Sequence, residues 1–436
     1  MKALIALLGL SSLAFAETVK DREGAVRGDK ATFEADARWN YNDVESGFKL
    51  AKTTKKPLLV ILRCAPCLSC AGMDAAVLQE KELVPLLDQF VCVRIINANA
   101  LDLARFQFDY DLSFSALMFN GDGTVYGRFG SWLHQKDPMN KTTASFRQAL
   151  EAALALHQGY PANKATLTGK QGGPVPYQTP VEFPTLAEKY QSKLDWDGKV
   201  VQSCVHCHMV GDAFRAHYRS QSKPVPVEWI YPQPSIEVLG ITLATDAVAK
   251  VEAVAAGTPA ATAGFQPGDE FTEFNGQPLI SIADVSWVLH RAPASGTLLA
   301  KVKRGSELLD LRLTLPPAWR NKSDISKRVG TWPMRAMAFG GMKMDDLDDV
   351  TREQLGLTKE QMALKIFHVG QYGPHAAAKK AGFQKDDLIL EIGDLNTRMT
   401  ESALIGHLLL SNLPGEKIPS VVLRGGERLK LELPQQ

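Results

Sequence analysis

Hydrophobic and polar positions divide the chain into an α/β part followed by a strand-rich part. In the first part, a stretch that starts after Asp43 places Phe48 and Ala51 on one helical face. The apolar run 58–62 then predicts a buried strand. This alternation of amphipathic and apolar stretches is typical of a sheet covered by helices.

Further elements follow from the same patterns. Residues 17–35 are charged and aperiodic, which predicts a loose leader. The remaining predictions are a helix from about 71, a strand at 90–95, a short helix at 101–106, hairpin strands at 116–119 and 124–128, and a helix at 142–156.

The N-terminus has the pattern of a secretory signal peptide. A basic start, Met1-Lys2, precedes an apolar block and a small-residue site that predicts cleavage after Ala16. No later stretch reaches about 18 consecutive apolar residues. We therefore expect an exported protein, periplasmic or secreted, with no transmembrane segment after signal removal.

Three cysteines, Cys64, Cys67 and Cys70, directly follow the predicted strand 58–62. Lys56-Pro57, an apolar strand and then cysteines resemble the thioredoxin superfamily over residues 36–160. The resemblance implies that Cys67, ten residues after Pro57, attacks substrate and that Cys70 resolves, with Cys64 as an extra thiol. A thiol at a helix start is stabilised as thiolate, which supports the same roles.

Other interpretations of this cluster stay open. Ile61 stands where classical thioredoxins have a buried acid, and Ser113-Phe114-Ser115 offers no proline for the loop that faces the dithiol. The cluster could instead form a structural disulfide. With Cys92 as a fourth sulfur it could also hold a metal or an iron–sulfur centre.

A second cysteine motif lies in the middle of the chain. Cys204, Cys207 and His208 form C-x-x-C-H, which predicts one covalent haem c with His208 on the iron. The alternative is a small disulfide or zinc knot with His206 or His217 as an extra ligand. No methionine occurs between Met209 and Met334, so this segment offers no ordinary methionine ligand for the second face of the haem.

The surroundings of this motif predict little regular structure before it. Residues 158–177 are rich in Gly, Pro, Thr and Lys and indicate a linker. A capping signature after Pro184 predicts a helix toward Trp196, and a further helix is expected through Phe214 and Tyr218.

The last two hundred residues contain an internal repeat. The segment 263–269, AGFQPGD, recurs at 381–387 as AGFQKDD, an offset of 118 residues (381 − 263). Both copies precede an alternating strand and resemble PDZ domains of the bacterial protease-associated type. The chain has no Gly-x-Ser-x-Gly element that would mark a serine protease.

The PDZ resemblance implies peptide binding through backbone N–H groups of a carboxylate-binding loop and an exposed strand edge. This loop falls at Leu239, Gly240 and Ile241 in the first copy, and at Gly341, Met342 and Lys343 in the second. The alternative is that both copies only pack against their neighbours.

Composition excludes one class of partner. Lys and Arg number 49 against 48 for Asp and Glu, so no nucleic-acid partner is indicated. The apolar share of 45% is that of an ordinary globular protein.

Taken together, the motifs resemble bacterial thioredoxin/PDZ (seleno)proteins, some of which carry selenocysteine at the redox position. The predicted fold class is multidomain, with an α/β thioredoxin-like domain, a small α-helical haem c-type segment and two β-rich PDZ domains. The predicted boundaries are signal peptide 1–16, leader 17–35, thioredoxin-like domain 36–160, linker and haem c-type segment 161–234, PDZ domains 235–317 and 334–436, and a linker 318–333.

These features predict an exported thiol redox protein. The Cys67 and Cys70 dithiol would exchange with a redox partner protein, the haem would pass single electrons, and the PDZ domains would recruit a partner by its C-terminus. Two rivals are a non-enzymatic scaffold with an inert thioredoxin fold and a haem-based sensor of peroxide or another small ligand.

Overall fold

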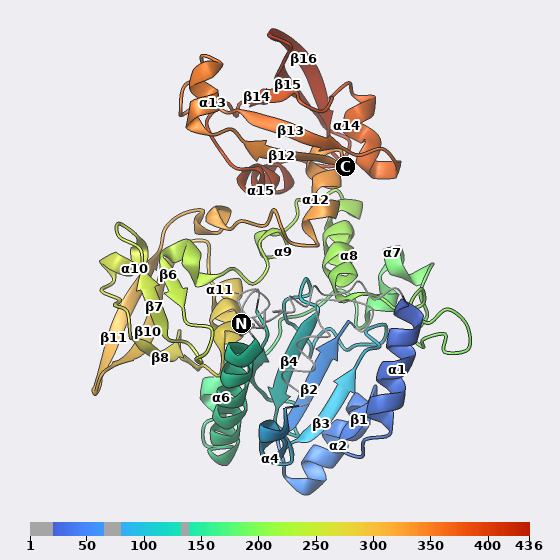
Figure 1. Ribbon diagram of the computed structural model, residues 1–436, viewed down its shortest axis with the longest axis vertical. Helices are drawn as coiled ribbons and strands as arrows, with labels where there is room; N and C mark the ends of the chain where they lie inside the picture. Colours follow the sequence, from blue (N-terminus) through green and yellow to red (C-terminus); the bar gives the residue numbers. More distant parts are fainter. Residues whose placement is uncertain (1–20, 65–79, 132–138) are drawn as a thin grey trace, which may run out of the picture.

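The computed structural model describes residues 21–64, 80–131 and 139–436. The predicted signal peptide, Cys67, Cys70 and the start of the helix predicted from about 71 lie outside these ranges. Figure 1 shows an N-terminal α/β domain, a β-rich body beside it and a second β-rich body stacked above. We call the two β-rich bodies unit 1 (residues 235–317) and unit 2 (residues 334–436).

The N-terminal domain is a five-stranded sheet in the order β1-β3-β2-β4-β5. Strands β1, β3 and β2 are parallel, whereas β4 and β5 run antiparallel to their neighbours. Its elements are α1 (Arg22–Glu34), β1 (Trp39–Tyr41), α2 (Val44–Thr54), β2 (Leu58–Arg63), α4 (Val84–Leu87), β3 (Val91–Ile95), β4 (Phe114–Phe119), β5 (Val125–Phe129) and α6 (Met139–Gln158).

Most sequence predictions for this domain are confirmed. The Asp43 side chain caps α2 by accepting a hydrogen bond from the Ser46 N–H at 3.0 Å. All six residues of β2 are buried, as the continuous apolar run predicted, because apolar side chains cover both faces of the sheet. The short helix predicted at 101–106 is wrong, since these residues form turns.

The loose leader is a second error, because residues 22–34 form α1. Only Val26 and Phe33 of this helix are buried, so its apolar stripe is too thin to stand out among charged residues. The helix is anchored at its start, where the Glu23 carboxylate accepts hydrogen bonds from the Val200 and Val201 N–H groups. Thus α1 holds the segment that leads to the C-x-x-C-H motif.

The predicted linker at 158–177 is also ordered. Residues 164–170 form the 3-10 helix η3 (Lys164–Lys170), which buries Leu167 in the core of the N-terminal domain. The helix predicted after Pro184 is only one turn, α7 (Pro184–Ala187), followed by irregular chain. The helix through Phe214 is confirmed as α8 (Cys207–Ser220), and a single turn, α9 (Val227–Ile230), follows it.

Units 1 and 2 share the order strand, strand, short helix, strand, helix, strand, strand, to which unit 1 adds β9 and unit 2 adds α13. Unit 1 contains η5 (Ile236–Leu239), β6 (Ile241–Leu243), β7 (Val251–Val254), α10 (Pro259–Thr262), β8 (Glu270–Phe274), β9 (Gln277–Pro278), α11 (Ile282–Arg291), β10 (Gly296–Arg304) and β11 (Glu307–Leu315). The connection holds η6 (Trp319–Lys322) and α12 (Thr331–Phe339), and unit 2 contains β12 (Met342–Asp346), α13 (Asp349–Gln354), β13 (Leu364–Val369), η7 (Gly373–Ala376), α14 (Ala377–Lys380), β14 (Leu388–Ile392), α15 (Glu401–Ser411), β15 (Lys417–Arg424) and β16 (Glu427–Pro434).

A buried carboxylate supports the repeat in atomic detail. In unit 1, the Arg304 guanidinium donates to both oxygens of Asp269, at 2.7 and 2.8 Å. In unit 2, Arg424 does the same to Asp387, at 2.6 and 2.7 Å. These are the aspartates at the end of the repeated segment, so the sequence repeat reflects one turn geometry held by the same bidentate pair.

The two units attach to the rest of the chain differently. In unit 1, α11 packs on β5, and the Asp284 carboxylate accepts from the Arg128 N–H and from the buried Lys170 ammonium. Gly127 permits this approach, since a Cβ there would lie 2.4 Å from Ile280. Unit 2 is reached through α8, α9 and α12, and the Arg219 guanidinium donates to the Asn412 and Gln436 carbonyls (Figure 1).

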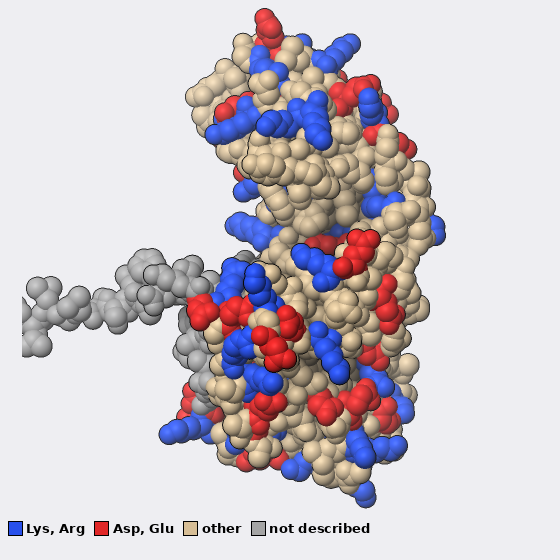
Figure 2. Space-filling model, turned by 90° about the vertical axis from the view of Figure 1, so that its right-hand side faces the viewer, with Lys and Arg blue, Asp and Glu red and all other residues tan. Residues whose placement is uncertain are grey.

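Charges of both signs are mixed on the surface. Figure 2 shows Lys and Arg interspersed with Asp and Glu over the visible face, without an extended area of one sign. In the described part of the chain, no helix is long and apolar enough to cross a membrane.

Candidate functional site

The central strand β2 delivers the first cysteine of the N-terminal cluster. The strand ends at Arg63, and the next residue, Cys64, donates its backbone N–H to the Ser113 carbonyl at 3.0 Å. This bond fixes Cys64 between the ends of β2 and β4. Cys64 therefore lies on the sheet edge where parallel strands end, the usual place for sites in α/β folds.

The C-x-x-C-H segment is brought to the same edge by a buried asparagine. Asn99 donates its side-chain N–H groups to the Gln191 and Ser203 carbonyls, at 2.6 and 2.8 Å. Its side-chain oxygen accepts from the Val205 N–H at 2.7 Å. Since Asn99 follows β3, these three bonds clamp the second motif against the end of the sheet.

The structure joins the two cysteine motifs through one contact. The Cys64 sulfur lies 3.1 Å from Nδ1 of His206, a hydrogen-bonding distance across 142 residues of sequence. Cys64, Cys204, His206 and Cys207 all line one small cavity. From the sequence, His206 is only a possible extra zinc ligand, and no sequence pattern predicts its pairing with Cys64.

Such a pair is chemically competent. A thiol beside an imidazole can transfer its proton to the ring, which leaves a thiolate stabilised by an imidazolium. The thiolate is the nucleophile in thiol–disulfide exchange.

Cys204 and Cys207 have a different environment. The Cys204 S–H donates to the Ile96 carbonyl at 3.6 Å, and burial raises the pKa of this thiol to about 11. Burial likewise raises the pKa of the Cys207 thiol to about 12. The two sulfurs are not joined in a disulfide. Both thiols are therefore protonated at neutral pH and are poor nucleophiles.

This arrangement does not fit a haem. The cavity between the two motifs is about 10 Å³, room for about one water molecule. Covalent attachment needs both sulfurs at the edge of a large flat macrocycle, but Cys204 is buried and Cys207 is half-buried beside the residues after β3. Nδ1 of His208 lies 3.7 Å from the Asp212 carboxylate and has no hydrogen-bond partner among the described residues.

The four-sulfur interpretation of the first cluster is wrong. Cys92 pairs with Leu59 near the start of β2, and its buried S–H donates to the Leu87 carbonyl. Cys64 is five residues further along the same strand direction, roughly 16 Å away at strand spacing. In the described ranges, no group of three or more His, Cys, Asp or Glu residues is arranged to hold a metal ion.

The loop predicted to bind peptide in unit 1 lies directly before β6, and its Gly240 N–H donates to the Glu237 carbonyl at 2.9 Å. Leu239 and Ile241 are buried in the core of the unit, and Gly240 between them adopts a left-handed conformation with φ of 95°. A side chain at Gly240 would collide with Thr258, so glycine is required there. β6 follows directly as the outer strand of the β6-β7 pair, where a peptide could add.

In unit 2, the corresponding loop is already occupied by the chain itself. The Gly340 and Gly341 N–H groups donate to the Ala336 and Arg335 carbonyls, where they cap α12. Beyond this loop, Met342 is buried and Lys343 is exposed on β12. These two glycine N–H groups are therefore not available to a carboxylate in this arrangement.

A buried ion pair also closes the strand next to that loop. The Glu401 carboxylate, at the start of α15, accepts from the Met344 backbone N–H at 2.8 Å. The Arg335 guanidinium of α12 donates to the same carboxylate at 2.9 and 2.6 Å. Unit 2 thus uses its groove to hold α12, as the packing alternative predicted.

The comparisons with known proteins identify two domains. Residues 39–121 match the family described as thioredoxin-like, and residues 250–304 match the PDZ domain family. A curated relative, the probable periplasmic serine endoprotease DegP-like of Hahella chejuensis (strain KCTC 2396), is 27% identical over 181 residues. The match covers 41% of this chain and 36% of the relative, so the chain spans about a third of the relative's length.

Two solved structures of the HtrA-type protease AlgW with a decapeptide, one of them a variant, are 19% identical over 32% of this chain. The matched region covers 40% of the variant's chain and 47% of the other chain. The TM-score is 0.21 for both structures, which is too low to carry an argument. What the matches establish is a multidomain chain with a thioredoxin-like domain over residues 39–121 and a PDZ domain over residues 250–304.

Proposed function

We propose that this chain is an exported thiol–disulfide exchange protein that recruits its partner through PDZ units. The observation that carries the proposal is the 3.1 Å contact between the Cys64 sulfur and Nδ1 of His206. It places a base beside a thiol at the functional edge of a thioredoxin-like domain, where sequence reasoning alone found neither an acid nor a cis-proline loop.

The reaction begins with proton transfer from the Cys64 thiol to His206. The thiolate attacks one sulfur of a partner's disulfide, a Cys64–partner disulfide forms, and the other partner sulfur leaves and takes up the proton from the imidazolium. A second thiol of this chain then attacks Cys64, which releases the partner fully reduced by two electrons. This chain is left with one internal disulfide, so the electrons balance without a cofactor.

The resolving thiol comes from the same cluster in this proposal. Cys67 and Cys70 lie outside the described residues; here one of them resolves, whereas the sequence predicted Cys67 as the attacking thiol and Cys70 as the resolving thiol. Burial raises the pKa values of the Cys204 and Cys207 thiols, so they stay protonated and do not attack in the arrangement described. Regeneration of the dithiol requires another dithiol protein as reductant.

Unit 1 supports partner recruitment better than unit 2. Its strand β6 is an outer strand to which a peptide could add, whereas the Met344 N–H of the outer strand β12 in unit 2 is bonded to Glu401. The loop N–H groups do not distinguish the units, because those of Gly240, Gly340 and Gly341 all donate to carbonyls of this chain. We assign recruitment to unit 1 and treat unit 2 as a second, PDZ-like body whose groove stabilises the chain.

Haem c at Cys204, Cys207 and His208 stays a competing proposal for these residues. The test is an absorption spectrum of protein produced with the haem c maturation machinery, beside a variant carrying Cys204→Ser and Cys207→Ser. A Soret band in the unsubstituted chain alone would show attachment and would mean that the segment 199–209 leaves the position described. Without such a band the haem proposal fails.

The exchange proposal is tested with an aromatic disulfide, 5,5′-dithiobis(2-nitrobenzoate), under single-turnover conditions. We expect the fully reduced chain to release thionitrobenzoate rapidly and Cys64→Ser to slow this release at least tenfold. Cys92→Ser serves as the control, because that thiol is buried. Equal rates for the chain and Cys64→Ser would exclude Cys64 as the entry point, and no native exchange at all would favour the inert scaffold.

A further inference from the structure

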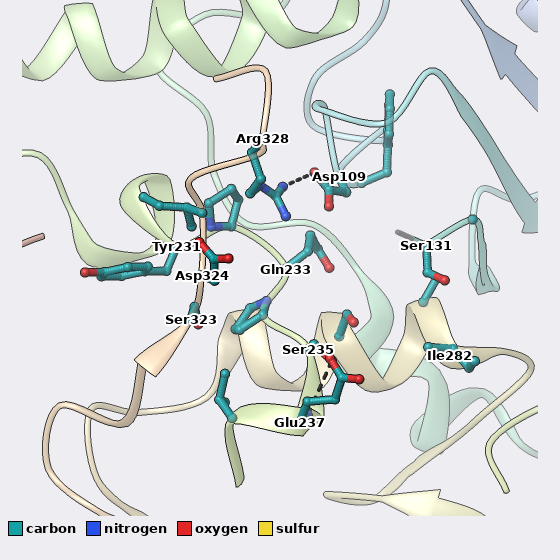
Figure 3. Close-up of a pocket in the computed structure, with 18 of the residues that line it drawn as sticks. Asp109, Ser131, Tyr231, Gln233, Ser235, Glu237, Ile282, Ser323, Asp324 and Arg328 are labelled. Carbon is teal, nitrogen blue, oxygen red and sulfur yellow. Dashed lines mark hydrogen bonds and ion pairs between the residues drawn. The ribbon is translucent and has the colours of Figure 1, made fainter. Parts of the chain in front are cut away.

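A cavity of about 630 Å³ lies between the thioredoxin-like domain, unit 1 and the connection to unit 2. Ser115 and Gly130 line it from the ends of β4 and β5, and Ile282 lines it from the start of α11. The opposite wall is the segment 322–328, which we call the strap. Figure 3 shows these elements surrounding an open centre.

The strap is held in place, so the cavity does not depend on a loose loop. The Arg328 guanidinium forms ion pairs with Asp109 and Asp111 of the thioredoxin-like domain. At the other side, the Ile325 N–H donates to the Ser402 hydroxyl of unit 2 at 3.0 Å. Each neighbouring body therefore supplies a fixed wall.

Two buried polar side chains in the wall lack hydrogen-bond partners among the described residues. Gln233 is 8% exposed, and none of the hydrogen bonds between described residues uses its side-chain amide. Figure 3 shows Gln233 directed toward the open centre, between Arg328 and Ser235. The Ser323 hydroxyl, in a residue 9% exposed, is likewise without a partner.

Gln233 also has a strained backbone. It lies between Pro232 and Pro234 with φ of 47°, a left-handed conformation that non-glycine residues seldom adopt. Strain of this kind is retained where surrounding structure fixes a side chain for a purpose. Here it fixes an amide at the cavity.

The chemistry of the wall indicates the kind of ligand. A glutamine amide offers one acceptor and two donors, which match the N–H and C=O of one peptide unit. Acidic and basic side chains both line the cavity, among them Glu237, Asp324 and Lys327, so no single charge is selected. An extended polypeptide, polar along its backbone and mixed in its side chains, fits this set.

The cavity also lies near the proposed redox pair. Ser115 lines it, and two residues earlier the Ser113 carbonyl accepts the Cys64 N–H. We infer that the cavity binds an extended segment of the partner polypeptide and directs it from unit 1 toward Cys64. This site differs from the edge of β6, whose residues 241–243 are not among those lining the cavity. The inference rests on the proposed function for the role of the bound segment, but not for binding itself.

The test uses reduced, carboxymethylated lactalbumin, an unfolded polypeptide without free thiols, and measures its binding to the full chain by fluorescence anisotropy. Gln233→Ala should weaken binding at least fivefold, and Gln233→Ala with Ser323→Ala should weaken it further. Gln89→Ala, an exposed glutamine distant in the fold, is the matched control and should leave binding unchanged. Unchanged binding in both cavity variants, with normal unfolding curves, would overturn the inference.

A second arm locates the bound chain. A photo-crosslinking residue in place of Gln233 should form an adduct with the lactalbumin probe, whereas the same residue in place of Leu308, exposed on β11, should not. Equal crosslinking at both positions would contradict a specific site. Neither arm needs a thiol, so the two proposals can fail separately. Lactalbumin binding without exchange with the aromatic disulfide would contradict only the exchange proposal. Exchange without lactalbumin binding would contradict only the proposed polypeptide site in the cavity.

Discussion

Cys64 and the pair Cys204 and Cys207 line the same small cavity, yet their environments differ. Cys64 follows the end of β2 and contacts an imidazole nitrogen at 3.1 Å. Cys204 is buried and Cys207 is half-buried like Cys64, but neither has a basic partner, and burial raises the pKa values of their thiols to about 11 and about 12. The comparison teaches that motif spacing indicates which sulfurs lie close together, whereas local solvation and partners decide which sulfur reacts.

The largest expected effect is the difference in alkylation rate between the two groups. At pH 7 a thiol with a pKa near 12 is about 10⁻⁵ ionised, against about 3% for an ordinary thiol. Iodoacetamide should therefore modify Cys64 in the reduced native protein roughly 10³-fold faster than Cys204 or Cys207. Peptide mass spectrometry of timed samples measures the three rates, and similar rates would remove the distinction.

Removing the three hydrogen bonds of the Asn99 side chain should bring the alkylation rates of Cys204 and Cys207 closer to that of Cys64. Asn99→Ala removes three hydrogen bonds and leaves buried backbone groups unsatisfied, at a cost of about 3 kcal/mol in the free energy of unfolding. Urea unfolding measures this loss, and alkylation of Cys204 and Cys207 should speed up. Asn97→Ala, whose side chain donates one exposed bond to the Ser192 carbonyl and accepts one from the Asn99 N–H, should cost less. Equal losses would argue against the clamp.

The raised pKa values of Cys204 and Cys207 also predict a dependence of stability on alkaline pH. Both thiols hold their protons more tightly when folded, so their contribution is complete below about pH 9 and is lost as pH rises toward 11 and 12. The free energy of unfolding should fall over this range. The free energy of unfolding of a variant with both cysteines changed to alanine should fall less steeply with pH. Parallel curves for the two proteins would contradict the raised pKa values of the two thiols.

The smallest effect is expected at His208. Its ring is about a third exposed and lies 3.7 Å from the Asp212 carboxylate, so His208→Ala should change the free energy of unfolding by less than about 1 kcal/mol. A much larger loss in urea unfolding would show that His208 has a structural role that its contacts do not explain.

Much of this architecture follows from the sequence because it depends on local patterns. The strand 58–62, the cap at Asp43 and the repeat at 263–269 were all predictable from spacing and residue type. The sequence patterns did not predict helix α1 or the 3-10 helix η3. Each has few buried residues, such as Val26 and Leu167, and these are buried by contacts with residues distant in the sequence.

The candidate site shows the same limit. The C-x-x-C spacings identified two cysteine motifs, but no local pattern records that β2 and the start of α8 meet at one edge. His206 was therefore overlooked, since its role depends on a contact 142 residues away. Likewise, the repeat predicted two equal peptide-binding loops, but the residues around them differ. The first residue of α11 in unit 1 is Ile282, which lines the large cavity. The first residue of α15 in unit 2 is Glu401, which binds the Met344 N–H.

The central claim is that His206 activates Cys64, and the pH dependence of Cys64 alkylation tests it most directly. With Cys67 and Cys70 changed to serine, the rate at Cys64 would be followed from pH 5 to 10 in the parent, in His206→Ala and in His217→Ala, a histidine further along the same helix. We predict that only His206→Ala lowers the rate at pH 7, by about tenfold or more, with the profile shifted to higher pH. Superimposable profiles for the parent and His206→Ala would contradict the account.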